Sequence, residues 1–101
     1  MRASGTPFVT WVTVRLSDFH VLSGQLVHVE WATRVRGCCG RCGTALIFQA
    51  AEDPDKIDVT VCSLDEPESI TPTDHIWVED RLPWVKLADG LPSHKRERPA
   101  R

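Results

Sequence analysis

RGCCGRCGTALIFQ, residues 36–49, is the stretch that decides the fold. Its first half is a glycine-rich turn that carries Cys39 and Cys42, three positions apart. Its second half, 44–49, is rich in apolar side chains and contains no helix breaker, so it predicts a strand. Two thiolates at this spacing can point at one metal ion, and the N–H groups of such a turn stabilise the charge on sulfur. The stretch therefore predicts a zinc knuckle that leads into a strand.

The sequence on both sides of this stretch also predicts strands. Valine, threonine and tryptophan are frequent in 8–16, while apolar and polar side chains alternate along 26–31 and 56–64. A further short strand is expected at 75–79. The sequence shows no convincing amphipathic helix of ten or more residues. The pattern predicts one all-β domain of antiparallel sheets over residues 1–92.

Length and charge restrict the functions that are open to the chain. With 101 residues it fits a single domain whose core alone is marginal, so a structural metal or disulfides would add stability. Between residues 51 and 80, ten acidic residues face one lysine, a local charge of −9 that argues against a nucleic-acid surface there. Residues 93–101 are basic, and we expect them to form a disordered tail.

The N-terminal region predicts neither secretion nor a membrane span, because threonines interrupt the apolar pairs of residues 8–14. We expect a cytoplasmic protein without a membrane partner. In a reducing compartment, cysteines are more often metal ligands or free thiols than disulfide partners. A thioredoxin-like redox role is disfavoured, since a strand rather than a helix is predicted after Cys42. Metal binding through Cys39 and Cys42 is the favoured interpretation.

A structural zinc site needs two ligands besides Cys39 and Cys42. Cys38 adjoins Cys39 and would point away from it in an extended chain. Cys62 is more often a small packing residue than a ligand. The histidines form no second closely spaced pair and are expected at ordinary surface or packing positions: His20, His28, His75 and His94. The residues alone thus supply half of a zinc site.

Four tryptophans without any tyrosine predict an aromatic core. Trp11, Trp31 and Trp77 are expected to pack inside the domain, whereas Trp84, beside a proline and close to the C-terminus, should be partly exposed. Aromatic walls could also line a ligand cleft, but packing is the favoured role.

Taken in order, the motifs of the chain resemble those of the glutathione-dependent formaldehyde-activating enzymes, a family related to the centromere protein V domain. The matching pieces cover nearly the whole chain, and their order is specific. They are Arg2-Ala3-Ser4-Gly5-Thr6-Pro7-Phe8, Gly24, Cys39-Gly40-Arg41-Cys42-Gly43-Thr44-Ala45-Leu46, Ser63-Leu64-Asp65-Glu66-Pro67, His75-Ile76-Trp77, Pro83-Trp84 and Asp89-Gly90-Leu91-Pro92.

The resemblance implies a zinc-bound β-tent and a carbon–sulfur lyase activity on the glutathione adduct of formaldehyde. It also implies two metal sites. In the structural site, a late pair corresponding to Cys39 and Cys42 combines with an early Cys-x-Cys pair. The catalytic site is a Cys-x-Cys-x-x-Cys cluster placed just before the Arg-x-Ser-Gly stretch. Met1 stands where that cluster should have ended, so no catalytic residue can be assigned here.

The expected function is that of a shortened zinc-binding domain of this family, with impaired or no catalysis and with glutathione or its adduct as the partner. Either the true start lies upstream, or the chain is a shortened paralogue. Three alternatives stay open: a lyase that obtains the missing cysteines from an upstream segment or another chain, a homodimeric module whose two Cys39/Cys42 pairs share one zinc, and a metal-free remnant.

Overall fold

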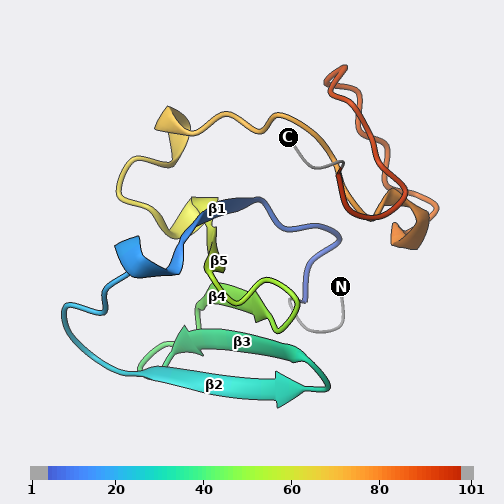
Figure 1. Cartoon of the computed structure of the whole chain (residues 1–101). Helices are drawn as coiled ribbons and strands as arrows, with labels where there is room; N and C mark the ends of the chain where they lie inside the picture. Colours follow the sequence, from blue (N-terminus) through green and yellow to red (C-terminus); the bar gives the residue numbers. More distant parts are fainter. Residues whose placement is uncertain (1–4, 99–101) are drawn as a thin grey trace. The chain divides into compact units, whose positions relative to one another are not determined.

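The computed structural model describes residues 5–98, which contain a five-stranded antiparallel sheet and four short 3-10 turns but no α-helix (Figure 1). The all-β prediction is therefore confirmed. The strand order is β1-β5-β4-β3-β2, so β1 and β2 are the two edges. The strands are β1 (Trp11–Arg15), β2 (Leu26–Trp31), β3 (Arg34–Cys39), β4 (Ala45–Ala50) and β5 (Lys56–Thr60).

Strand β3 corrects the sequence prediction, which treated residues 36–43 as a turn. Arginine, glycine and two cysteines give this segment little strand propensity of its own. It is a strand because it pairs along its length with both neighbours, β2 and β4. A two-residue turn joins it to β2, and Ala32 in that turn has a positive φ of 53°.

The chain divides into two compact units. Residues 10–70 form the first, which contains the whole sheet, and the described residues 5–9 and 71–98 belong to the second. In the first unit the buried apolar side chains are Ile47, Ile57 and Val61, at 2–4% exposure. None of the helical segments in residues 5–98 has the length and apolar character needed to cross a membrane.

Gly37 lies in this core, beside Ile47 on the adjacent strand. A Cβ at Gly37 would stand 2.5 Å from Cγ1 of Ile47 and 2.9 Å from its Cδ1. We expect Gly37→Ala to lower the free energy of unfolding by about 1–3 kcal/mol, because the buried Ile47 must shift to make room. Urea unfolding would measure this. The loss of stability caused by Gly37→Ala should be smaller in an Ile47→Ala variant than in the wild type. An equal loss in the two proteins would contradict the explanation.

In the second unit, segments 75–79 and 92–96 run beside each other. His75 forms a parallel bridge with Ser93, and the amide of Trp77 donates to the carbonyl of Arg96 at 3.0 Å. The predicted strand at 75–79 is wrong, because only His75 bridges and Val78–Asp80 is a 3-10 turn. Residues 93–98, predicted as part of a disordered tail, make these contacts, and the domain boundary at residue 92 stays a prediction.

Polar side-chain contacts also link residues of this unit. His75 Nε2 lies 2.9 Å from Asp89 Oδ2, and His94 Nε2 lies 3.2 Å from Asp74 Oδ2. The guanidinium of Arg98 contacts Asp74 at 3.1 Å. Arg96 ion-pairs with Glu79 at 2.7 Å. The carboxylate of Asp89 also accepts from the amide of Leu91, as expected for an aspartate in a turn.

The hydrogen bond from His75, followed by that from the Leu91 amide, lowers the pKa of Asp89. A carboxyl group with a lowered folded-state pKa stabilises the fold above its unfolded-state pKa, and this stabilisation is lost as the pH falls through the folded-state value. We expect the wild type to be more stable than Asp89→Asn at pH 5, with the difference shrinking as the pH falls below about 4. Thermal unfolding of both proteins across pH 2–5 tests this, and a constant difference would contradict it.

The tryptophans occupy three different environments. Trp11 packs against Phe48 with ring centroids 6.0 Å apart, and Trp77 is half-buried with Arg96 5.5 Å above its ring. Trp84 is 67% exposed, as expected. The prediction for Trp31 is wrong, since it is 82% exposed at the end of edge strand β2. The aromatic side chains therefore do not form one shared core.

Candidate metal centre

The cysteine turn joins the end of β3 to the start of β4. Its ends are closed by two backbone hydrogen bonds of 2.8 Å, from the Cys39 amide to the Thr44 carbonyl and from the Gly43 amide to the Cys39 carbonyl. Gly43 has a φ of 79°, a left-handed conformation that glycine adopts without the strain of a Cβ. This glycine lets the chain reverse immediately after Cys42 and enter β4 at Ala45.

Hydrogen-bonding groups of the turn are directed at both sulfur atoms. The Arg41 amide donates to Cys39 Sγ at 3.4 Å, and Thr44 Oγ1 lies 3.0 Å from Cys42 Sγ. The side chain of Thr44, then its backbone, and then the Cys39 thiol lower the pKa of Cys42. Hydrogen bonds to the charged form favour a thiolate, the form that binds metals.

Two thiolates carried on one turn could supply two of the four ligands of a tetrahedral zinc site. Over residues 5–98, no group of three or more His, Cys, Asp or Glu side chains is arranged to hold a metal ion. In the described part of the chain, Cys39 and Cys42 therefore remain the two candidate ligands at this turn. The assignment of Cys39 and Cys42 as zinc ligands stays a prediction.

The other candidate ligands lie elsewhere. Cys38 and Cys39 are consecutive on β3 and so face opposite sides of the sheet. Cys62 is exposed in the 3-10 turn Val61–Ser63. His28 lies on edge strand β2, and His75 is hydrogen-bonded to Asp89 within the other unit.

An open apolar hollow adjoins Cys39. It has a volume of about 780 Å³, and Phe19, Leu26 and Leu46 are among its lining residues. Cys39 and Arg41 also line it, which places a thiol and a cation against apolar walls. Concave apolar surfaces with a few polar groups are typical of small-molecule sites. A ligand bound in this hollow would contact Cys39 and Arg41 of the cysteine turn.

Two further arginines near the turn in sequence point to the opposite face. Arg34 and Arg36 alternate with Val35, Gly37 and Cys39 along β3, and their guanidinium groups lie 5.6 and 4.9 Å from the centre of the Phe48 ring. Burial, and then repulsion from Arg34, lowers the pKa of Arg36. Arg41 is thus the arginine that shares the hollow with Cys39.

Sequence reasoning missed the role of Thr44. Its hydroxyl contacts Cys42 Sγ, and its carbonyl accepts from the Cys39 amide. The available signal was its position two residues after Cys42, where a hydroxyl can reach back to the sulfur across the glycine. Thr44 therefore supports both cysteines without being a ligand.

These features define a class of protein: a small all-β domain that presents a cysteine pair on the turn between two strands. The chain belongs to the glutathione-dependent formaldehyde-activating enzyme family, whose family model matches residues 1–80. The match confirms the resemblance seen in the sequence and identifies a domain of the formaldehyde-activating type. No curated protein matched the chain.

Proposed function

We propose that the chain is a zinc-binding domain in which Cys39 and Cys42 supply two thiolates to a structural zinc. The observation that carries this proposal is the direction of the Arg41 amide and the Thr44 hydroxyl towards the two sulfur atoms. Two more ligands would come from a segment outside these 101 residues or from a second chain, because no third ligand lies at the turn in residues 5–98. The domain would span residues 1–92 and work in the cytoplasm, where thiols stay reduced.

Glutathione or its formaldehyde adduct is the proposed small-molecule partner, given the family to which the chain belongs. In the hollow, Arg41 would attract a carboxylate of glutathione, and the apolar walls would contact its aliphatic parts. The 101 residues contain no Cys-x-Cys-x-x-Cys cluster, which the family resemblance assigns to the catalytic zinc. We therefore expect little or no carbon–sulfur lyase activity from these residues alone.

Elemental analysis of the purified chain, together with its native mass, tests the zinc proposal. One zinc per dimer would support a site shared between two Cys39/Cys42 pairs. One zinc per monomer would keep the zinc proposal but contradict the proposed source of the other two ligands, since the same chain would then have to supply them. A folded chain without zinc, even after refolding with excess metal, would overturn the proposal and leave a metal-free module.

A second candidate function is an interaction module, which the exposed apolar side chains of β2 favour. Val27, Val29 and Trp31 are 50%, 61% and 82% exposed. Large apolar side chains gathered on one strand mark interaction surfaces more often than scattered ones do.

A further inference from the structure

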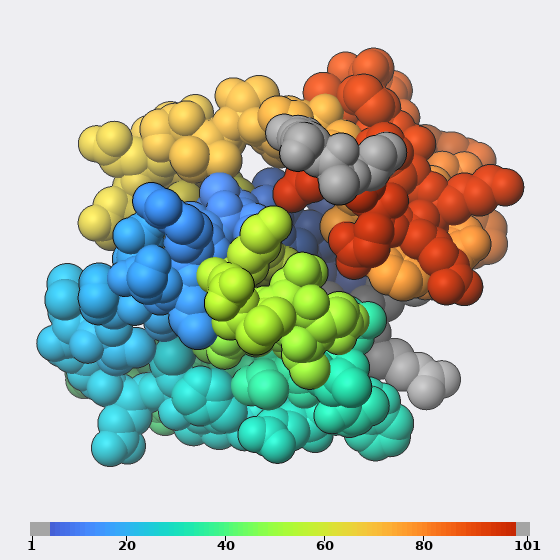
Figure 2. All heavy atoms as spheres, viewed as in Figure 1, coloured from blue at the N-terminus to red at the C-terminus, as the bar shows by residue number. Residues whose placement is uncertain are grey.

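Strand β2 is an edge of the sheet, and its side chains Val27, Val29 and Trp31 are exposed. In Figure 2 the cyan and teal segment that contains β2 lies along the lower surface of the view. In the described chain its neighbour in the sheet is β3. Val27, Val29 and Trp31 alternate with His28 and Glu30, so the apolar and polar side chains occupy opposite faces of the strand. Proteins usually protect a long exposed edge, because its free backbone groups can pair with another strand.

The free backbone groups of β2 can be identified from its pairing with β3. The Gly40 amide donates to the Gln25 carbonyl, and a two-residue turn separates Trp31 from its partner Arg34. In an antiparallel pair, hydrogen-bonded and non-hydrogen-bonded positions alternate. The N–H and C=O groups of Val27 therefore point towards β3, whereas those of His28 and Glu30 point outwards.

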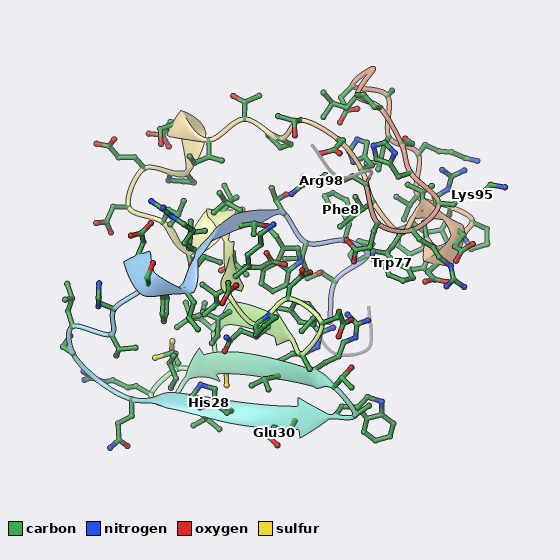
Figure 3. The ribbon with its side chains drawn as sticks, in the orientation of Figure 1. Phe8, His28, Glu30, Trp77, Lys95 and Arg98 are labelled. Atoms are coloured by element: carbon green, nitrogen blue, oxygen red, sulfur yellow. The ribbon has the colours of Figure 1, made fainter. Side chains whose placement is uncertain are left out.

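We propose that β2 pairs antiparallel with the β2 strand of a second copy of this chain, about a two-fold axis that passes through Val29. This register places His28 opposite Glu30 of the partner subunit, and both residues lie on the free edge (Figure 3). Their outward N–H and C=O groups would exchange hydrogen bonds on each side of the axis. The two five-stranded sheets would become one continuous sheet.

The side chains favour this register over its neighbours. Across the axis, Val29 would meet Val29 of the partner subunit, and Val27 would meet Trp31 of the partner subunit. On the other face, each imidazole would lie beside a carboxylate, a complementary pair. A register centred on Glu30 would instead oppose two carboxylates, and one centred on His28 would oppose two imidazoles. Self-complementarity of this kind is the requirement for a two-fold interface.

This dimer differs from one that shares a zinc ion. Cys39 lies opposite Leu26, at one end of β2. In the proposed register, the two Leu26 residues are separated by six positions along the strands, which is about 20 Å at the rise of a strand. The two cysteine turns are thus too far apart to bind one zinc, and the β2 dimer does not depend on the proposed metal site.

Sedimentation equilibrium of the full chain, with and without a zinc chelator, tests the proposal. We expect a wild-type dimer that survives chelation. Val29→Lys should raise the dimer dissociation constant at least about tenfold, because two lysines would meet across the axis. Leu22→Lys, at a site 94% exposed and outside the strands, is the matched control and should leave the dissociation constant unchanged.

The register is tested by exchanging the charges. Glu30→Lys should weaken the dimer, and the double change His28→Glu with Glu30→Lys should restore it, since a carboxylate again faces a cation. A monomeric wild type, a dimer that dissociates on chelation, or a Val29→Lys variant that dimerises as well as the wild type would overturn the proposal. Circular dichroism confirms that each variant retains its sheet before it is compared.

Discussion

Replacing both Cys39 and Cys42 with serine is expected to abolish zinc binding by the chain. Serine removes both thiolates and leaves hydroxyls that bind zinc far more weakly, so the affinity should fall by at least about 100-fold. Competition with a chromogenic chelator measures the affinity, and elemental analysis gives the metal content. When zinc binding is lost, the increase in thermal stability that zinc gives should be lost too, because a ligand stabilises only the state that binds it.

Cys62→Ser is the matched control for this variant. Cys62 is exposed in a 3-10 turn and lies outside the knuckle, so its loss should change neither zinc content nor affinity. Cys38→Ser is a stricter control, because Cys38 adjoins Cys39 but faces the other side of the sheet. Zinc that is retained by the double variant, or lost equally in both controls, would contradict the assignment of Cys39 and Cys42.

The strands that the sequence located correctly are those with a strong local pattern. Alternation predicted 26–31, which is β2, and the apolar run at 44–49 corresponds to β4. Of the strand predicted at 56–64, the part 56–60 is β5, but the prediction is wrong beyond Thr60, where Val61–Ser63 is a 3-10 turn. Strand β3 was missed because its stability comes from its two neighbours, not from its own side chains. The pairing of β1 with β5, which sets Trp11 opposite Thr60, joins segments far apart in the sequence and leaves no local signal.

At the cysteine site too, the features that depend on adjacent residues could be predicted, and those that depend on the rest of the sheet could not. The spacing of Cys39 and Cys42 predicted a turn that gathers two thiols, since this depends on a few adjacent residues. The sequence could not show that Arg34 and Arg36 lie on the opposite face, because the strand that sets their direction was not recognised. Trp31 was assigned to the core on its residue type, whereas its exposure follows from its place at the end of an edge strand.

Ile57→Ala should remove a large part of the stability of the sheet. Ile57 is 2% exposed and belongs to the small apolar core of the sheet. Truncating a buried isoleucine to alanine costs about 2–5 kcal/mol, from the lost burial and the cavity that remains. A domain of this size has only about 5–15 kcal/mol in total. Leu22→Ala, at a site 94% exposed, is the control and should change the unfolding free energy by less than about 0.5 kcal/mol.

Urea unfolding of the Ile57→Ala variant with and without zinc tests whether zinc bound at the cysteine turn stabilises the folded state that the truncated core destabilises. Free zinc at about 100 times its dissociation constant would add about 2.7 kcal/mol to a folded state that binds it, which is comparable to the loss from the truncated core. Zinc should therefore restore much of the stability of Ile57→Ala when Cys39 and Cys42 are intact, and none when both are serine. A truncation that costs less than about 1 kcal/mol would mean that the sheet does not depend on its small apolar core. Rescue by zinc in the absence of both cysteines would mean that the metal acts at another place in the chain.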